Sequence, residues 1–330
     1  MVGKFGSYAE LNRIHLFPIL MKGAGRFAMA ALVSFAVFFG LALCSTQVRR
    51  IVLPNESNVG GIGERLTELK SCSNKVDVVI LGSSVAMNGI VPQQFNTDSS
   101  IAFSLASNGQ YLGNSEILLR TSLETLEPKL VILDVAPFLW KSSYSAECAL
   151  DWSIRTPIHS SPWSNAALSM SVHSGDAQAL FVSTTFWLLR FFQTPYDPLI
   201  DPNENYLGQG FSSSTKCQET GLKLHSFDAH DPPTPTAVDG ALKHIENIQL
   251  MCNKSNVELV VVIPPHLQKL ENHNDIKVAL KRFSTIDGQD WTGSEESANF
   301  RDEHHLCRTG AEEYTKWLLL QIRQQAKSFR

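Results

Sequence analysis

Four short runs of aliphatic residues stand out in the pattern of hydrophobic and polar positions. They cover Val76–Leu81, Ile101–Leu105, Leu130–Val135 and Val257–Ile263. Each run is too continuous in apolar residues to be a strand with one solvated face, because such a strand alternates apolar and polar positions. The pattern therefore predicts four strands that are buried on both faces.

Segments with the spacing of amphipathic helices lie between and after these runs. Leucine and isoleucine recur at helical intervals in Asn114–Pro128 and in Ala237–Asn256. The last segment, Thr309–Lys327, begins with Thr309 as a predicted N-cap and carries Glu312 three residues later, as in a capping box. Strands that alternate with helices are typical of right-handed βαβ crossovers. We therefore expect a three-layer α/β/α domain, in which helices cover both faces of a parallel sheet.

One long interval, residues 141–236, breaks this alternation and is rich in Ser, Pro and Trp. We interpret it as an insertion that shapes or covers a site. Its apolar run Ala179–Phe192 is short for a bilayer, which favours a helix packed on the domain over a membrane-dipping element. Trp140, Trp152 and Trp163 fit core packing better than stacking on sugar rings.

The N-terminal part of the chain contains an uncharged apolar run of 18 residues, Phe27–Cys44. As a helix this run is about 27 Å long, just enough to cross a bilayer core of about 30 Å. Basic residues are enriched before it, so the positive-inside rule predicts a cytoplasmic segment 1–26 and a single-pass anchor in the cytoplasmic (inner) membrane. A linker with a first helix (45–75) then leads to the α/β domain (76–330) on the extracytoplasmic or periplasmic side. A cleaved signal peptide and a lipoprotein signal ending at Cys44 remain alternatives.

Charge and cysteine content narrow the function classes. The formal net charge of the 330 residues is −4, which gives no basic field for nucleic acid. The six cysteines include no CxxC pair, which argues against a zinc ribbon. Five of them lie outside the predicted anchor, and they allow up to two disulfides with no preferred pairing.

Candidate chemistry lies at both ends of the predicted domain. Gly82, Ser83 and Ser84 follow the first predicted strand, at the sheet edge where α/β proteins hold ligands. Alone, this stretch predicts only a turn with a capping serine. Near the C-terminus, however, Asp302 and His305 are three residues apart. A serine nucleophile needs a histidine base and a carboxylate that orients the base, and one loop offers both.

Together, the blocks "LGSSVAMNGIVP" and "DEHHLCRTGAEEY" resemble those of the SGNH (GDSL-type) hydrolases. The resemblance extends from about Val76 to the C-terminus, apart from the insertion, and implies a flavodoxin-like sheet and no cofactor. It is strongest to membrane-anchored extracytoplasmic branches: the D-alanyl-lipoteichoic acid transfer protein and the proteins of alginate and exopolysaccharide O-acetylation.

The resemblance also implies roles for individual residues. Ser84 corresponds to the nucleophile, with Ser83 in place of the family's usual Asp. His305 corresponds to the general base and Asp302 to its orienting partner. In "SLASNGQYLGN", Gly109 matches the glycine whose backbone N–H helps to form the oxyanion hole, and the Ser84 N–H is the second donor.

Other residues near these blocks are candidates for weaker roles. Asn108 and His266 are candidates for substrate contact, although an exposed loop histidine is the simpler interpretation of His266. His304 and His305 with Asp302 and Cys307 do not have a standard ligand spacing, so no metal is expected.

The sequence departs from the family pattern after the third predicted strand. The family has a Gly-x-Asn-Asp block there, whereas "LVILDVAPFLW" contains Asp134 and no Asn. A missing side-chain donor costs about 2.7–4 kcal/mol of transition-state stabilisation if nothing replaces it. The same block is altered in the lipoteichoic-acid and exopolysaccharide branches, so the resemblance implies a specialised transferase and not a general esterase. Asp134 is expected to be structural.

The function expected from these features is a membrane-anchored serine acyltransferase or esterase. The resemblance implies transfer of an O-acetyl or similar acyl group on a cell-surface polysaccharide or wall polymer. It also implies an integral-membrane acyltransferase as partner. The alternative is a catalytically inactive SGNH-like protein that binds or assembles polysaccharide.

Overall fold

The computed structural model describes residues 62–72, 75–136, 143–156, 161–189, 206–217, 235–267 and 273–328. All of these belong to one compact unit, Asn58–Arg330. The predicted anchor Phe27–Cys44 and Trp140 lie outside the described residues. No helix within the described ranges combines the length and the hydropathy that a membrane span requires.

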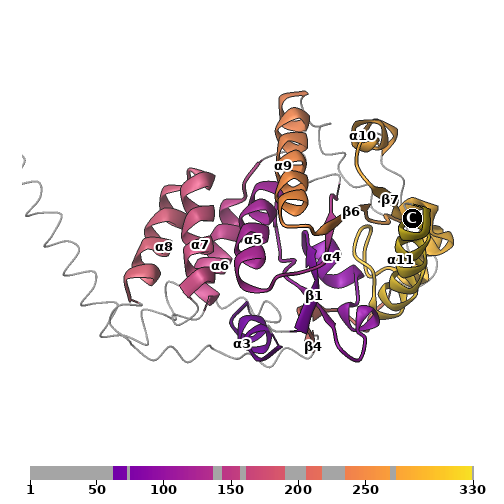
Figure 1. Ribbon diagram of the computed structural model, residues 1–330, viewed down its shortest axis with the longest axis horizontal. Coiled ribbons are helices and arrows are strands. Elements are labelled where there is room, and N and C mark those ends of the chain that lie inside the picture. The colour runs from indigo at the N-terminus through magenta and orange to yellow at the C-terminus, as the bar shows by residue number, and fades with distance from the viewer. Residues whose placement is uncertain are drawn as a thin grey trace, which may run out of the picture. The chain divides into compact units, whose positions relative to one another are not determined.

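A five-stranded parallel sheet forms the centre of this unit (Figure 1). Its order is β2-β1-β3-β6-β7, which is the 2-1-3-4-5 order of flavodoxin-like sheets when these strands are numbered among themselves. The four predicted runs form four of the five strands. The strands are β1 (Val76–Leu81), β2 (Ile101–Ser104), β3 (Leu130–Asp134), β6 (Glu258–Ile263) and β7 (Thr285–Asp287).

Helices cover both faces of the sheet. Consecutive strand residues point to opposite faces, so each strand contributes side chains to two separate core clusters. Val79 and Leu81 of β1 pack into one core cluster, and Val78 and Ile80 pack into the other. The predicted α/β architecture, with a parallel sheet between layers of helices, is therefore confirmed. The first cluster includes side chains from α3 (Ile62–Cys72), α5 (Leu112–Thr125), α9 (Pro235–Lys254) and α10 (His273–Leu280). The second includes side chains from α4 (Ser84–Gly89), α11 (Arg308–Ser328) and the short 3-10 helix Pro92–Phe95. Further 3-10 turns cover Gly288–Asp290, Thr292–Glu295 and Ser297–Asn299.

In its described residues, the interval predicted to be an insertion contributes three helices and a small hairpin. The apolar run Ala179–Phe192 is helical as far as Leu189, and this helix packs against the two before it. Trp152 and Trp163 are buried with ring centroids 6.1 Å apart, which supports their packing role. The elements are α6 (Ala146–Arg155), α7 (Ser161–Ser174), α8 (Ala177–Leu189), β4 (Tyr206–Gly208) and β5 (Phe211–Ser212).

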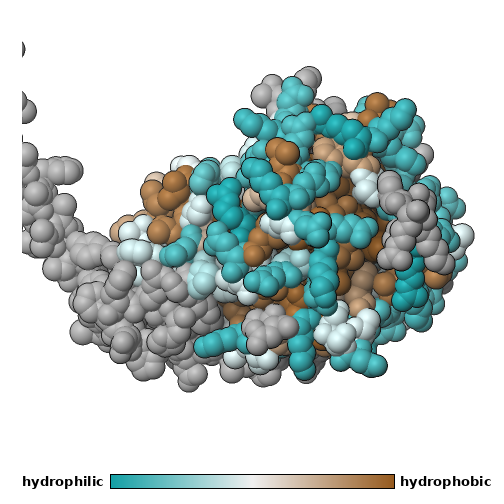
Figure 2. Space-filling model, in the orientation of Figure 1, coloured by the Kyte–Doolittle hydropathy of each residue, from teal (hydrophilic) through white to brown (hydrophobic). Residues whose placement is uncertain are grey.

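The outer side of α7 and α8 is partly apolar. Figure 2 shows brown side chains gathered over this helix pair, where Val172, Leu180 and Phe181 are exposed. Over the rest of the visible face, teal polar side chains are interspersed with brown apolar ones (Figure 2). The helix predicted from Ala179–Phe192 therefore buries one side against the domain and leaves part of the other side in solvent.

A disulfide joins Cys217, after the hairpin, to Cys307, directly before α11. Cys72, Cys148 and Cys252 are free thiols. The last helix begins at Arg308, because the Cys307 carbonyl already accepts from Ala311 N–H at 2.9 Å.

The predicted capping box at the start of α11 is therefore wrong. Thr309 lies inside the first turn of the helix and is not its N-cap. The Glu312 side chain pairs with Arg308 at 3.1 Å instead of capping the backbone. The helix therefore starts two residues earlier than the capping pattern indicates, directly after the disulfide-bonded Cys307.

Candidate active site

A sharp turn after β1 presents Ser84 at the carboxyl edge of the sheet. Gly82 makes this turn with φ +151°, a conformation that residues with a Cβ rarely adopt. Ser83 is the N-cap of α4, and its hydroxyl accepts from Val85 N–H at 3.2 Å. Of the two serines in the turn, Ser83 therefore takes the capping role, which leaves the hydroxyl of Ser84, the first residue of α4, for other contacts.

A tight loop before α11 carries the other two predicted residues. Phe300 and Leu306 pair across its base. Asp302 Oδ1 accepts from the backbone N–H of His304 at 3.2 Å and of His305 at 2.8 Å. The aspartate thus shapes the loop that carries its histidine.

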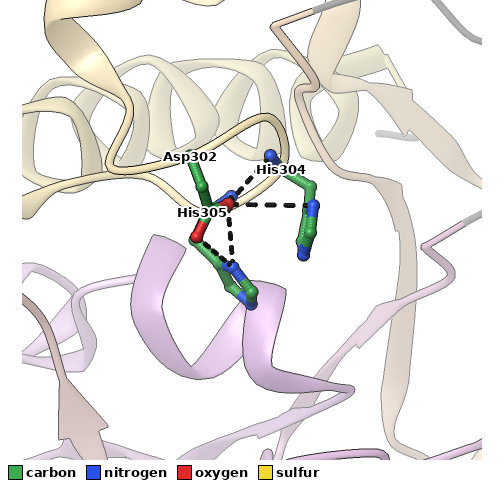
Figure 3. A group of neighbouring side chains, drawn as sticks. All are labelled: Asp302, His304 and His305. Carbon is green, nitrogen blue, oxygen red and sulfur yellow. Dashed lines mark hydrogen bonds and ion pairs between the residues drawn. The ribbon is translucent and has the colours of Figure 1, made fainter. Parts of the chain in front are cut away.

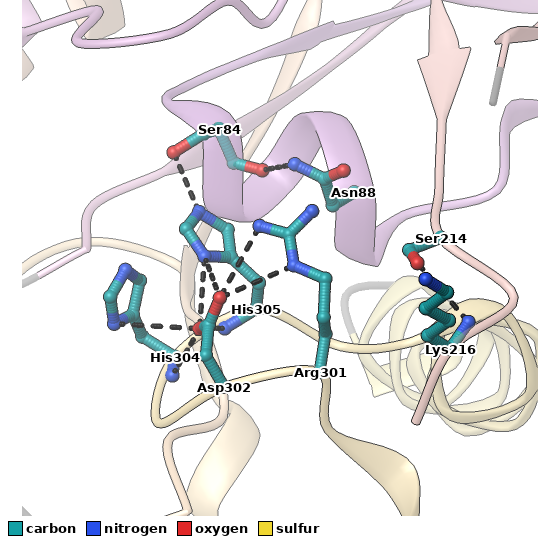
Figure 4. A network of polar contacts seen from close by, with 8 residues as sticks. All are labelled: Ser84, Asn88, Ser214, Lys216, Arg301, Asp302, His304 and His305. Atoms are coloured by element: carbon teal, nitrogen blue, oxygen red, sulfur yellow. Dashed lines mark hydrogen bonds and ion pairs between the residues drawn. The ribbon is translucent and has the colours of Figure 1, made fainter. Parts of the chain in front are cut away.

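The structure brings Ser84, His305 and Asp302 together in one chain of hydrogen bonds (Figure 4). His305 Nε2 lies 2.8 Å from Ser84 Oγ, and His305 Nδ1 lies 3.0 Å from each carboxylate oxygen of Asp302. Asp302 accepts the proton of Nδ1, so Nε2 has a lone pair for the Ser84 hydroxyl. This geometry suits removal of the Ser84 proton by His305.

The charge of Asp302 suits this arrangement. Burial alone would raise the pKa of its carboxyl group, but the hydrogen bond and charge of His305 outweigh burial and lower the pKa well below its usual value. Asp302 is therefore ionised at neutral pH and stabilises the imidazolium that forms when His305 takes a proton.

A second carboxyl group, Asp134, lies under the nucleophile turn at the end of β3. Its Oδ1 accepts from Ala136 N–H at 2.9 Å, and its Oδ2 accepts from the Ser83 hydroxyl at 3.5 Å. The side chain is 1% exposed, and burial raises the pKa of Asp134 to about 7. Asp134 was expected to be structural, and its contacts show that it supports the turn before Ser84.

Two further polar residues beside the triad were not among the predicted site residues. Asn88 donates from Nδ2 to the Ser84 carbonyl at 2.5 Å, and Arg301 donates from Nε and Nη2 to Asp302 Oδ2 at 3.3 Å each (Figure 4). Sequence spacing offered a signal for both, because Asn88 is one helical turn after Ser84 and Arg301 precedes the Asp-x-x-His block.

The predicted oxyanion glycine lies in the loop after β2. Gly109 has φ +59°, the left-handed conformation of a turn. The loop is tied to the nucleophile turn, because Ser107 N–H donates to the Gly82 carbonyl at 3.1 Å. In the part of the chain that the structure describes, no hydrogen bond joins Gly109 or Asn108 to Ser84. The oxyanion role of Gly109 and the substrate role of Asn108 therefore stay predictions.

His266 is not an exposed loop residue, so that interpretation was wrong. Its side chain is buried, and burial together with the charges of His304, His273 and His305 lowers the pKa of His266 to about 3. His266 is buried because the loop that carries it pairs with the triad loop. Leu267 N–H donates to the carbonyl of Glu303 at 3.0 Å. Substrate contact by His266 stays a prediction.

Asp302, His304 and His305 also form a candidate cation site (Figure 3). Their ligand atoms lie within 4.8 Å of one another. The His305 nitrogens already hydrogen-bond with Asp302 and Ser84, so a cation held by His305 would displace one of these bonds. The arrangement therefore fits a hydrogen-bonded dyad better than a set of metal ligands.

Comparisons with known proteins add little to this geometry. No family model and no curated protein matches the sequence. Among solved structures, the chain is similar to the crystal structure of a "putative acylhydrolase" from Bacteroides fragilis NCTC 9343, with 12% sequence identity and a TM-score of 0.40. The match covers 82% of this chain and 99% of that chain. Likeness at this level carries no argument about activity, so any functional assignment depends on the site itself.

Proposed function

We propose that this protein is a serine acyl-transfer enzyme of the SGNH type, with Ser84 as nucleophile, His305 as general base and Asp302 as its orienting carboxylate. The observation that carries the proposal is the continuous hydrogen-bonded chain from Ser84 Oγ through His305 to Asp302. Its residues come from the start of α4 and from the loop before α11, which are more than two hundred residues apart in sequence. This order of nucleophile, base and carboxylate is the one that acyl transfer requires.

The proposed reaction has two half-reactions. His305 Nε2 takes the hydroxyl proton while Ser84 Oγ attacks the acyl carbonyl, and the imidazolium then gives this proton to the leaving alcohol. An acyl-Ser84 ester remains. A second hydroxyl, from water or from an acceptor, loses its proton to His305 and attacks this ester. The imidazolium then gives the proton to Ser84 Oγ as the acyl product leaves, which restores the Ser84 hydroxyl.

The backbone N–H groups of Ser84 and Gly109 are the proposed donors to the oxyanion. The Asn that serves as a side-chain donor in SGNH hydrolases has no counterpart in the sequence after β3. The same block is altered in the lipoteichoic-acid and exopolysaccharide branches that the sequence resembles. This resemblance supports transfer to a bound hydroxyl over hydrolysis of simple esters.

The proposed substrate is the one that the resemblance of the two sequence blocks implies, and the proposed location is the one that the predicted anchor implies. We propose an O-acetyl or similar acyl group, a cell-surface polysaccharide or wall polymer as acceptor, and an integral-membrane acyltransferase as the partner that delivers the acyl group. The predicted anchor Phe27–Cys44 would hold the domain on the extracytoplasmic side. The Cys217–Cys307 disulfide supports this location, because disulfides persist mainly in oxidising compartments.

A serine-reactive fluorophosphonate probe tests the nucleophile directly. We expect the wild-type protein to be labelled and Ser84→Ala to be unlabelled, with loss of turnover of a chromogenic acetyl ester. Ser83→Ala is the matched control, because it removes the neighbouring buried hydroxyl but keeps every residue of the triad, so it should still be labelled, although more slowly than wild type. Labelling of Ser84→Ala at the wild-type rate would remove this mechanism.

The competing function is a non-catalytic protein that binds or assembles polysaccharide. The missing Asn after β3 favours it, because that loss weakens the oxyanion hole. Folded wild-type protein that shows neither labelling nor ester turnover would support this alternative.

A further inference from the structure

We propose that Asp134 is a positioning residue for the nucleophile: its carboxylate holds the backbone of the turn that presents Ser84 to His305. This inference rests on the proposed function, since it gives Asp134 a part in the reaction of the same site. Asp134 does not touch Ser84 Oγ in this account and acts through the main chain of the residues around it.

The hydrogen bonds of Asp134 join two elements. Ala136 N–H, just after β3, donates to Oδ1 at 2.9 Å. The Ser83 hydroxyl, directly before α4, donates to Oδ2 at 3.5 Å, and the backbone N–H groups of Ser83 and Ala86 favour the charged form of the carboxylate. The first N–H groups of a helix have no partner within the helix, so a carboxylate near this end is favourable. The end of β3 thereby fixes the direction in which α4 begins.

Close packing makes the turn sensitive to the Asp134 side chain. A Cβ at Gly82 would lie 2.5 Å from the Asp134 Cβ and 2.9 Å from Oδ2. Asp134 therefore packs directly on the bare backbone of Gly82, two residues before the nucleophile. A change in this side chain moves the turn, and with it the 2.8 Å contact from Ser84 Oγ to His305 Nε2.

The surroundings offer no replacement for the carboxylate. A small cavity under α4 is lined by Asp134 and Tyr314 and otherwise by residues without polar side chains. Tyr314 is buried, and within the described residues its hydroxyl has no hydrogen-bond partner. The other lining residues are Val85, Ala86, Gly89, Ile90, Val262, Pro264, Pro265 and Leu306.

The test is Asp134→Asn in the full chain. Asn keeps the shape of the side chain and one acceptor oxygen. Its NH2 group, however, cannot accept the hydrogen bond that the second carboxylate oxygen of Asp134 accepts. We expect the rate of fluorophosphonate labelling and kcat for an acetyl ester to fall together by about 10- to 100-fold, with KM unchanged, because orientation and not binding is lost. Asp134→Glu is not expected to restore the rate, since Gly82 leaves no space for an added methylene.

Asp287→Asn is the matched control, because Asp287 ends β7 as Asp134 ends β3. It is a buried carboxylate that accepts from a backbone N–H, that of Gln289, at 3.1 Å, but its side-chain partners are His273 and Lys277 and not α4. We expect Asp287→Asn to be labelled at the wild-type rate. A purely structural role for Asp134 would give both variants the same small change in rate.

The outcomes separate this inference from the proposed function. Labelled wild-type protein together with folded Asp134→Asn that reacts at the wild-type rate would overturn the role of Asp134 alone. Wild-type protein without labelling would overturn the proposed function and this inference with it.

If Asp134→Asn does not fold, Ser83→Ala tests the inference instead, because it removes the hydroxyl that contacts both Asp134 and the Val85 N–H. It is then expected to label about threefold to tenfold more slowly, and a wild-type rate would refute the inference.

Discussion

Two carboxyl groups near Ser84 have pKa values that are shifted in opposite directions. Asp302 is partly exposed, and its contacts with His305 lower its pKa in spite of partial burial. Asp134 is fully enclosed, and burial raises its pKa to about 7 although several N–H groups favour its charged form. Asp302, which must stay ionised, is therefore paired with His305, which can carry a positive charge. Asp134, which holds the backbone of the turn, has neutral donors as its partners.

The raised pKa of Asp134 predicts how stability depends on pH. The folded pKa of about 7 lies above the usual value of 3.8, so the folded protein binds this proton more tightly than the unfolded chain does. The contribution of Asp134 to the free energy of unfolding is therefore full below about pH 4 and is lost as the pH rises through about 7. At about 1.4 kcal/mol per pH unit, the loss from about pH 5 to about pH 8.5 is at most about 3 kcal/mol.

Urea unfolding of wild type and Asp134→Asn at these two pH values measures this effect. Asn does not ionise, so we expect the variant to gain stability relative to wild type as the pH rises. Asp287→Asn should show no such trend, because the pKa of Asp287 is lowered to about 2 and its carboxylate stays ionised over this range. A constant difference between Asp134→Asn and wild type would contradict the prediction.

At the scale of elements, the disulfide joins the small hairpin of the insertion to the triad loop. Cys307 is two residues after His305, and Arg308 N–H also donates to the Ser214 carbonyl at 2.9 Å. The bond closes a sequence separation of 90 residues. The end of the Asp302–His305 loop is thus held on one side by this covalent link and on the other by α11.

We therefore expect Cys217→Ser to lower both stability and reactivity. Loss of a disulfide of this kind typically costs about 2–5 kcal/mol of unfolding free energy. The labelling rate of Ser84 should fall by several-fold, because His305 is less firmly placed. Cys252→Ser is the matched control, since Cys252 is a buried free thiol. Equal denaturation midpoints and labelling rates for Cys217→Ser and wild type would refute a structural role for the bond.

Much of the element pattern could be predicted because the main strands are long aliphatic runs. The strand β7 was missed because Thr285–Asp287 is only three residues long and contains a single aliphatic residue. Ser84, Asp302 and His305 could be proposed because the two blocks have a recognisable order. The contact of Asp134 with α4 could not, because it depends on β3 lying next to β1 in the sheet. Burial of His266 likewise depends on pairing between two loops distant in sequence.

At the scale of the whole molecule, the predicted anchor and the α/β domain are separate units of the chain. The compact unit Asn58–Arg330 contains the triad, the disulfide and both core clusters. The predicted anchor Phe27–Cys44 precedes this unit. A chain that begins at Asn58 should therefore fold and react with the probe without any residue of the anchor.

We expect the full chain to sediment with membranes and to resist extraction with alkaline carbonate, whereas the chain from Asn58 stays in solution and labels at the same rate. A matched full-length control is Val37→Asp, which places a charge in the middle of the apolar run at a cost of about 2.5–3.5 kcal/mol for insertion. This variant should partly leave the membrane fraction and still be labelled. Full-length wild type that remains soluble would refute the anchor and leave the triad standing. An Asn58 chain that is soluble and folded but unlabelled would show that the site needs the N-terminal segment, because every residue of the triad is still present.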